Sequence, residues 1–199
     1  MVRKGICVPM MALCLLFCSC GAEEMNREDV QSRYQRVERC TMEAIVCCEQ
    51  DGLEWEAELH CEYIPGGNST VEVLSPETIA GIKAVMDDTN WHLEYEDMVL
   101  DAAPLSVEKI SPAVCLTFLM NSLRNGWVLE ENMELWNDLP CYRITVDQSG
   151  KQEKIISTIW LLQKDMTPLR GEISVGGEII LTAEFTDFSF YDTIETQGA

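Results

Sequence analysis

Apolar and polar side chains alternate without a break over residues 53–63. One set of alternate positions is apolar or weakly polar: Leu53, Trp55, Ala57, Leu59, Cys61 and Tyr63. The other set is polar: Glu54, Glu56, Glu58, His60 and Glu62. A period of two is typical of an antiparallel strand with one buried and one solvated face. We therefore predict that Trp55 and Leu59 lie on a buried face, opposite Glu56 and Glu58, because a one-residue slip would bury unpaired carboxylates.

Further strand patterns precede and follow this segment. Residues 40–48 are rich in Met, Ile, Val and Cys, and the dipeptide Asp51-Gly52 predicts a hairpin between the two segments. Pro65-Gly66-Gly67-Asn68 predicts the next turn. The other predicted strands are Thr70–Leu74, Trp91–Tyr95, Met98–Leu100, Trp127–Met133, Cys141–Val146, Ile155–Leu162, Leu169–Val175 and Glu178–Phe190. Residues 79–86 fit a strand or a turn followed by a strand, and Ser75-Pro76-Glu77 before them is typical of a helix start.

Two helices are predicted. The first covers residues 27–37, where Val30, Tyr34 and Val37 have helical spacing. The second begins at Ser111-Pro112, with Ser as the N-cap and Pro at the first helical position, and ends at Asn125-Gly126. Its apolar stripe is Leu116, Leu119, Met120 and Leu123.

These elements predict an α+β domain that is mainly β, with about ten antiparallel strands. Long strands with one apolar face need a cover, and the two helices could supply it. An up-and-down β-barrel of the lipocalin type is the alternative.

The N-terminus has the pattern of an export signal. Arg3 and Lys4 precede an apolar run from Ile6 to Phe17, which is shorter than the roughly 20 residues of a membrane-spanning helix. Ser19 directly before Cys20 resembles the lipobox of bacterial lipoproteins. That resemblance implies cleavage before Cys20 and diacylation of its sulfur, and two acyl chains give stable anchoring.

The lipobox-like segment departs from the usual pattern at two positions, where Phe17 and Cys18 replace a Leu and a small residue. An ordinary secretory signal and an uncleaved anchor are the alternatives. The lipoprotein interpretation predicts a signal peptide over 1–19, a lipidated tether over 20–26, one domain over 27–192 and a tail over 193–199. It places the protein on the extracytoplasmic face of the cell membrane.

The charge of the chain excludes some partners. Its 199 residues include 34 acidic and 14 basic residues, giving a net charge of −20. Nucleic acid is not expected as a partner, because phosphate binding depends on Lys and Arg. The same charge argues against electrostatic docking on anionic lipid.

The cysteines do not form a metal-binding pattern. Of ten cysteines, six follow the predicted lipid site: Cys40, Cys47, Cys48, Cys61, Cys115 and Cys141. None of these forms a C-x-x-C pair, so a zinc site is not expected. We expect small, semi-buried strand residues, and an extracytoplasmic location would also allow a disulfide such as Cys40–Cys61.

The sequence gives no sign of catalysis. It contains two histidines, His60 and His92, and no G-x-S-x-G, H-E-x-x-H or P-loop pattern. The glutamates of residues 53–63 do not converge on an ion, because they follow one strand. We expect a protein that is not an enzyme and that uses neither metal nor cofactor.

Two stretches together resemble a known superfamily. The first runs from Ser75-Pro76-Glu77-Thr78-Ile79-Ala80-Gly81-Ile82 through Leu93-Glu94-Tyr95-Glu96-Asp97 to the helix at Ser111-Pro112. The second runs from Asp165-Met166-Thr167-Pro168-Leu169-Arg170 to Phe185-Thr186-Asp187-Phe188-Ser189-Phe190. Each motif is loose, and their order carries the resemblance. Over about residues 27–192, the chain resembles the lipoprotein-carrier (LolA/LolB-like) superfamily. It is more closely similar to the germination lipoproteins (GerS-type) of Gram-positive spore formers.

The resemblance implies a strongly curved antiparallel sheet, a half-barrel, with helices on its concave face and an apolar cavity between them. It implies binding of an apolar ligand, a lipid or an acyl chain, in that concavity. The residues expected to bind the ligand are Trp55, Leu59, Leu116, Leu119, Met120 and Leu123. The alternative is an interaction protein that docks and supports a cell-envelope or spore-cortex enzyme, as the germination relatives suggest.

Overall fold

The computed structural model describes residues 27–50, 53–87, 90–101, 111–150 and 154–192. The predicted signal peptide, the lipid site Cys20, the tether and the C-terminal tail lie outside these residues.

The described chain forms two α-helices, one 3₁₀ helix and eleven strands. In chain order they are α1 (Arg27–Gln35), β1 (Val37–Gln50), β2 (Leu53–Tyr63), β3 (Ser69–Ser75), β4 (Lys83–Met86), β5 (Trp91–Tyr95), β6 (Met98–Asp101), η1 (Pro112–Val114), α2 (Cys115–Asn125), β7 (Trp127–Trp136), β8 (Leu139–Asp147), β9 (Ile155–Leu162), β10 (Pro168–Val175) and β11 (Glu178–Asp192).

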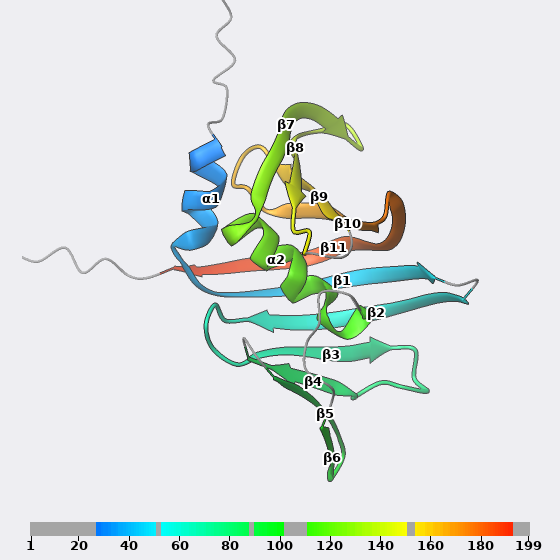
Figure 1. Cartoon of the computed structure of the whole chain (residues 1–199). Coiled ribbons are helices and arrows are strands. Elements are labelled where there is room, and N and C mark those ends of the chain that lie inside the picture. Colours follow the sequence, from blue (N-terminus) through cyan, green and yellow to red (C-terminus); the bar gives the residue numbers. More distant parts are fainter. Residues whose placement is uncertain (1–26, 51–52, 88–89, 102–110, 151–153, 193–199) are drawn as a thin grey trace, which may run out of the picture.

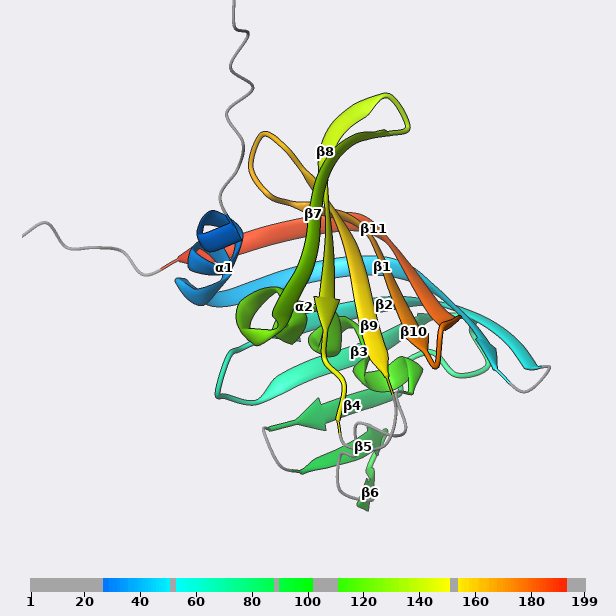
Figure 2. The ribbon, with the colours of Figure 1, turned by 45° about the horizontal axis from the view of Figure 1, so that its top comes forward.

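All eleven strands belong to one antiparallel sheet in the order β6-β5-β4-β3-β2-β1-β11-β10-β9-β8-β7. The chain runs strand by strand from β1 to the edge strand β6, crosses through η1 and α2, and starts again at the opposite edge with β7 (Figure 1). It then returns to the centre, where β11 pairs with β1. Both views show the sheet strongly curved (Figures 1 and 2).

The sheet is open between β6 and β7, which do not pair within the described residues. The lipocalin-type barrel is therefore wrong. The physical reason is the connection: the chain joins β6 to β7 through η1 and α2 rather than through a hairpin, and the two edge strands do not complete each other's hydrogen bonds.

The predicted register of β2 is confirmed. Gln50 pairs with Leu53 across the β1–β2 hairpin. Leu59 and Cys61 are buried, Trp55 is half-buried, and Glu56 is exposed. Side chains on alternate positions therefore divide between an inner, apolar face and an outer, acidic face.

Helix α2 packs on the inner face of the sheet. Leu119 is fully buried, and a Cβ atom placed on Gly171 of β10 would lie 2.6 Å from Leu119 Cδ1. The hydroxyl of Tyr63, at the end of β2, donates to Asn121 Oδ1 over 2.6 Å. The helix thus contacts strands on both sides of the β1–β11 pair, and Figure 2 shows it in front of the sheet.

Helix α1 is held to the end of α2. Gln31 Nε2 donates to the carbonyl of Gly126 over 2.7 Å, and Arg124 Nη1 donates to the carbonyls of Tyr34 and Gln35, each over 2.9 Å. The two bonds from Arg124 satisfy carbonyl groups at the C-terminal end of α1, and the bond from Gln31 satisfies the carbonyl of the residue that caps α2; such groups lack partners within their own helix.

The predicted helix start at Ser75-Pro76-Glu77 is wrong. Residues 76–81 form turns, in which the N–H of Ile79 bonds to the carbonyl of Pro76 over 3.1 Å. The N–H of Val73 bonds to the carbonyl of Ile82 over 2.9 Å, so the chain returns to β3 at once and leaves no room for a helix. The alternative, a turn followed by the strand β4, is confirmed.

The suggested disulfide between Cys40 and Cys61 is not present, because all six described cysteines are free thiols. Cys40 pairs with Tyr63, while Cys61 pairs with Met42. The two cysteines are therefore diagonal neighbours, with backbones roughly 7–8 Å apart, beyond the usual reach of a disulfide.

Within the described ranges, no helix combines the length and apolarity that crossing a membrane requires. Nor does the described part of the chain bring together three or more His, Cys, Asp or Glu side chains that could hold a metal ion.

Candidate functional site

An apolar cavity of about 340 Å³ lies between the inner face of β2–β5 and the start of η1. Its strand residues are Trp55 and Leu59 on β2, Val71 and Val73 on β3, Ala84 on β4, and Trp91 and Leu93 on β5. Ile79 and Ile82 come from the turn before β4, and Ser111, Pro112 and Ala113 complete the lining. No charged side chain is among these described residues.

The sheet register brings the strand residues of the cavity together. Leu59 lies opposite Val73, Val71 opposite Ala84, and Ala84 opposite Leu93. Directly opposed residues in antiparallel strands point to the same face, so these side chains form a continuous apolar surface.

The opposite side of the cavity begins the crossover helix. Pro112 occupies the first position of η1, where its missing N–H costs nothing. Ser111 occupies the N-cap position, but its side chain makes no cap hydrogen bond. Its Oγ is buried and has no hydrogen-bond partner among the described residues. Ser111 is the one polar residue in a described lining that is otherwise apolar.

Two of the six residues expected to bind a ligand, Trp55 and Leu59, line this cavity. The other four belong to the core: Leu116, Leu119, Met120 and Leu123 are at most 1% exposed and do not line it. These four side chains pack against the sheet that α2 covers. Ligand binding by any of the six stays a prediction.

Sequence reasoning missed most of the cavity wall. Val71 and Val73 on β3, and Leu93 on β5, follow the same alternation that singled out Trp55 and Leu59. That alternation could have marked them as residues of the inner face. It could not have shown that β2–β5 keep a free cavity, because this depends on where the crossover helix lies.

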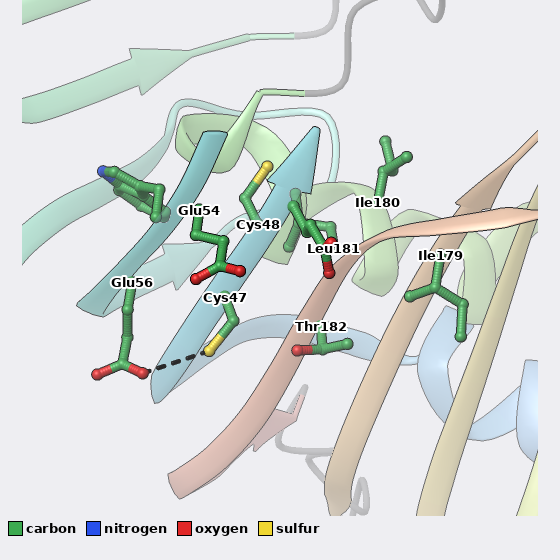
Figure 3. A pocket seen from close by; sticks show the side chains of 10 residues that line it. Cys47, Cys48, Glu54, Glu56, Ile179, Ile180, Leu181 and Thr182 are labelled. Atoms are coloured by element: carbon green, nitrogen blue, oxygen red, sulfur yellow. Dashed lines mark hydrogen bonds between the residues drawn. The ribbon is translucent and has the colours of Figure 1, made fainter. Parts of the chain in front are cut away.

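A second pocket, of about 430 Å³, lies at one end of β1, β2 and β11 (Figure 3). It is more polar, and Glu49, Glu54 and Glu56 are among its lining residues. Cys47 Sγ donates a hydrogen bond to Glu56 Oε2 over 3.6 Å, drawn in Figure 3. The pKa of Cys47 is raised, first by desolvation and then by the bond to the Glu56 carboxylate. Because the thiolate is the reactive form, this arrangement does not activate a nucleophile.

A third hollow, of about 1,050 Å³, lies beside the end of α1 and includes Arg33, Arg36 and Arg124. Two of these arginines already have partners in the fold. Arg33 forms an ion pair with Asp192, and Arg124 binds the carbonyls that end α1. The contacts that hold α1 and the end of β11 in place therefore account for most of this hollow.

Neither histidine lines the apolar cavity. His60 Nδ1 lies 3.6 Å from Glu43 Oε1 on the outer face, and His92 Nε2 lies 3.1 Å from Glu94 Oε1. The cavity can thus hold an apolar molecule, but its described lining supplies no acid, base or activated nucleophile.

No protein-family model matches the chain, and a search of curated proteins finds no match. Among solved structures, the chain is similar to a DUF1329 family protein from Desulfovibrio piger, with a TM-score of 0.49 and 10% identity over 87% of this chain and 93% of that chain. A putative outer membrane lipoprotein-sorting protein domain from Vibrio parahaemolyticus gives a TM-score of 0.48 and 11% identity over 86% and 96%. A LolA superfamily protein from Nitrosomonas europaea gives 0.42 and 12% over 85% and 95%. Similarity at this level concerns only the path of the backbone, and it identifies neither a ligand nor a partner of this protein.

Proposed function

We propose that the protein is a membrane-anchored extracytoplasmic lipoprotein that binds one apolar ligand, a lipid or an acyl chain, without catalysing a reaction. The observation that carries the proposal is the cavity between β2–β5 and η1, whose described lining is apolar apart from Ser111. A cavity of this composition favours a ligand that gains from leaving water.

The size of the cavity limits the ligand. Its volume of about 340 Å³ is near the lower end of the range for small-molecule sites, roughly 300–1,000 Å³. Each buried methylene contributes about 0.8 kcal/mol. Burying about ten of them therefore gains more free energy than association costs at the low end of its range, ~4 kcal/mol, and the difference is net binding affinity. A single chain of about ten carbons therefore suits the cavity better than two long acyl chains.

The location rests on the sequence. The lipobox-like segment ending at Cys20 supports export and lipid anchoring, and α1 begins at Arg27, a short tether further on. The narrower assignment to the germination lipoproteins of Gram-positive spore formers is part of this proposal and has the same sequence support.

A titration tests ligand binding. We expect 1-decanol to bind the mature protein saturably, with a change in tryptophan fluorescence, because Trp55 and Trp91 line the cavity. Val73→Trp, which fills the cavity, should weaken binding at least tenfold. Val175→Trp is the matched control, because Val175 is a half-buried valine on β10 that does not line the cavity. Equal binding by both variants, or no saturable binding by the unaltered protein, would contradict the proposal.

Docking of an envelope or spore-cortex enzyme is the second candidate, and one observation favours it. Apolar side chains are exposed on both edge strands: Val99 and Leu100 on β6 are 62% and 60% exposed, and Trp127 and Leu135 on β7 are 75% and 68% exposed. Exposed apolar patches often mark protein interfaces. Under this alternative, Leu100→Ser and Leu135→Ser abolish co-purification of an envelope enzyme and leave the 1-decanol titration unchanged.

A further inference from the structure

Trp127 is the most exposed large apolar side chain of the described chain, at 75%. We propose that Trp127 and the arginine-lined hollow beside α1 seat this end of the domain on the membrane in which Cys20 is anchored. The surface thus contacts an anionic phospholipid bilayer, with the indole at the interface and the arginines against lipid phosphates. This inference rests on the lipid anchor of the proposed function, and it adds which part of the domain the bilayer contacts.

Trp127 differs from the other tryptophans in having no place in the packing of the fold. Trp55 and Trp91 line the apolar cavity, and Trp136 and Trp160 pack against each other with ring centroids 5.4 Å apart. Trp127 instead begins the edge strand β7 and is open to solvent. An indole has an apolar body and one N–H donor, so it suits a bilayer interface, which is apolar on one side and wet on the other.

The contacts of α1 place Trp127 near the point where the tether enters the domain. The residue before it, Gly126, accepts a hydrogen bond from Gln31 Nε2 over 2.7 Å, and both views show α1 beside the end of α2 (Figures 1 and 2). Gln31 lies about 6 Å along the helix from Arg27. The tether from Cys20 to Arg27 spans no more than about 25 Å. Acyl chains at Cys20 therefore hold the bilayer within reach of Trp127.

The hollow beside α1 supplies positive charge to the same surface. The charged residues of its lining are Arg33, Arg36, Arg124, Glu38 and Asp192. Arg33 pairs with Asp192, whereas Arg36 is exposed and forms no ion pair with another described residue. Arg124 lies in the last turn of α2, three residues before Trp127. Since the planar guanidinium group matches the geometry of a phosphate, this lining suits phospholipid head groups.

The net charge of −20 does not prevent the contact. Charges in water are screened over about 8 Å at physiological ionic strength, so a bilayer senses the charges nearest to it. The acidic outer face is further away: Glu56 lies opposite Cys47, which is roughly 33 Å along β1 from Val37 in the lining of the hollow. The expectation that the charge of the chain opposes docking on anionic lipid therefore applies to the acidic face and not to this end.

Tryptophan quenching tests the inference on the mature, acylated protein, reconstituted in vesicles of equal amounts of brominated phosphatidylcholine and phosphatidylglycerol. Bromine quenches a tryptophan that is in contact with the bilayer. We expect Trp127→Phe to at least halve the quenching, because it removes the indole at the interface. Trp136→Phe is the matched control, because Trp136 lies at the other end of β7 and packs against Trp160. It should not lower the quenching.

A charge reversal tests the arginines in the same vesicles. Arg36→Glu should lower the quenching about twofold, because a basic side chain near an anionic surface is attracted to it and an acidic one is repelled. Lys154→Glu is the matched control. The carbonyl of Lys154 accepts a bond from the N–H of Gly176 over 2.9 Å, so it lies where β11 begins, at the opposite end of that strand from Asp192. It should leave the quenching unchanged.

Flotation of the vesicles separates the possible failures. If the protein floats with the vesicles and Trp127→Phe is quenched as strongly as the unaltered protein, the inference is overturned and the lipid anchor stands. Trp127 is then open to a protein partner. Equal effects of Arg36→Glu and Lys154→Glu would likewise overturn the role of the hollow. A protein that does not float with the vesicles would instead overturn the lipid anchor of the proposed function, and this inference with it.

Discussion

At the scale of single residues, the surface thiol of Cys47 shows how a neighbour decides reactivity. Cys47 is exposed on β1, where a free thiol would normally react readily. The glutamate opposite it, Glu56, accepts its hydrogen bond and places a negative charge beside the sulfur. Desolvation is the largest cause of the raised pKa of Cys47, and the hydrogen bond and charge of Glu56 raise it further, so exposure alone does not make this cysteine reactive.

We predict that Glu56→Gln speeds the alkylation of Cys47 by iodoacetamide several-fold at pH 8. The pKa of Cys47 is raised in the unaltered protein, so the thiolate fraction at this pH is small and rises when the carboxylate is removed. Mass spectrometry of the Cys47 peptide measures the rate. Glu54→Gln, which changes a neighbouring glutamate on the same strand, is the control. The difference should shrink as the pH rises above the pKa, and equal rates at pH 8 would show that Glu56 does not act on the thiol.

At the scale of elements, the two helices form one unit. Arg124, in the last turn of α2, donates to two carbonyls at the end of α1, while Gln31 on α1 donates to the carbonyl of Gly126. A nine-residue helix is marginal by itself in water. The position of α1 therefore depends on these contacts and on its buried residues Val30 and Tyr34.

We predict that Arg124→Met lowers the free energy of unfolding by about 1–2 kcal/mol, because the carbonyls lose a charged donor. Hydrogen exchange of the α1 amides should speed up more than that of β1. Arg36→Met is the control, because Arg36 is an exposed arginine with no ion pair to another described residue. Urea unfolding followed by circular dichroism measures the change. Equal effects of the two substitutions would argue against the capping role of Arg124.

At the scale of the whole molecule, the first helix and the last strand end close together. Arg33 on α1 forms an ion pair with Asp192, the last residue of β11, and Figure 1 shows these elements at the same end of the sheet. A tether from Cys20 to Arg27 can span no more than about 25 Å when fully extended. An anchor at Cys20 would thus hold this end of the domain near the membrane surface.

We predict that Cys20→Ala abolishes labelling of the protein by radioactive palmitate in the cells that produce it. Cys20 follows the small residue Ser19, whereas Cys18 follows the bulky Phe17. Cys18→Ala is therefore the matched control and should keep the label. Unchanged labelling of Cys20→Ala would exclude Cys20 as the lipid site, whereas absence of label from the unaltered protein would exclude the lipid anchor itself.

The sequence by itself determined the local elements of this protein. The alternation of residues 53–63, the hairpin signal at Asp51-Gly52, and the helix between Pro112 and Gly126 depend on neighbours along the chain. Such patterns fix the conformation of a segment and the face that it buries, because side chains repeat with the period of the backbone. They were enough to predict most strands and to place Trp55 and Leu59 on the inner face.

Only the tertiary structure decided what each buried face meets. The pairing of β1 with β11, which puts Ala44 opposite Phe185, joins segments far apart in the chain, and no local pattern contains it. The same holds for the cavity: the stripe of Leu116, Leu119, Met120 and Leu123 is apolar whether it packs on a sheet or on a ligand. The sheet packs against those four side chains, and the cavity lies instead between β2–β5 and Ser111. An apolar side chain gains similar free energy from any apolar neighbour, so its position in the sequence cannot say which neighbour it has.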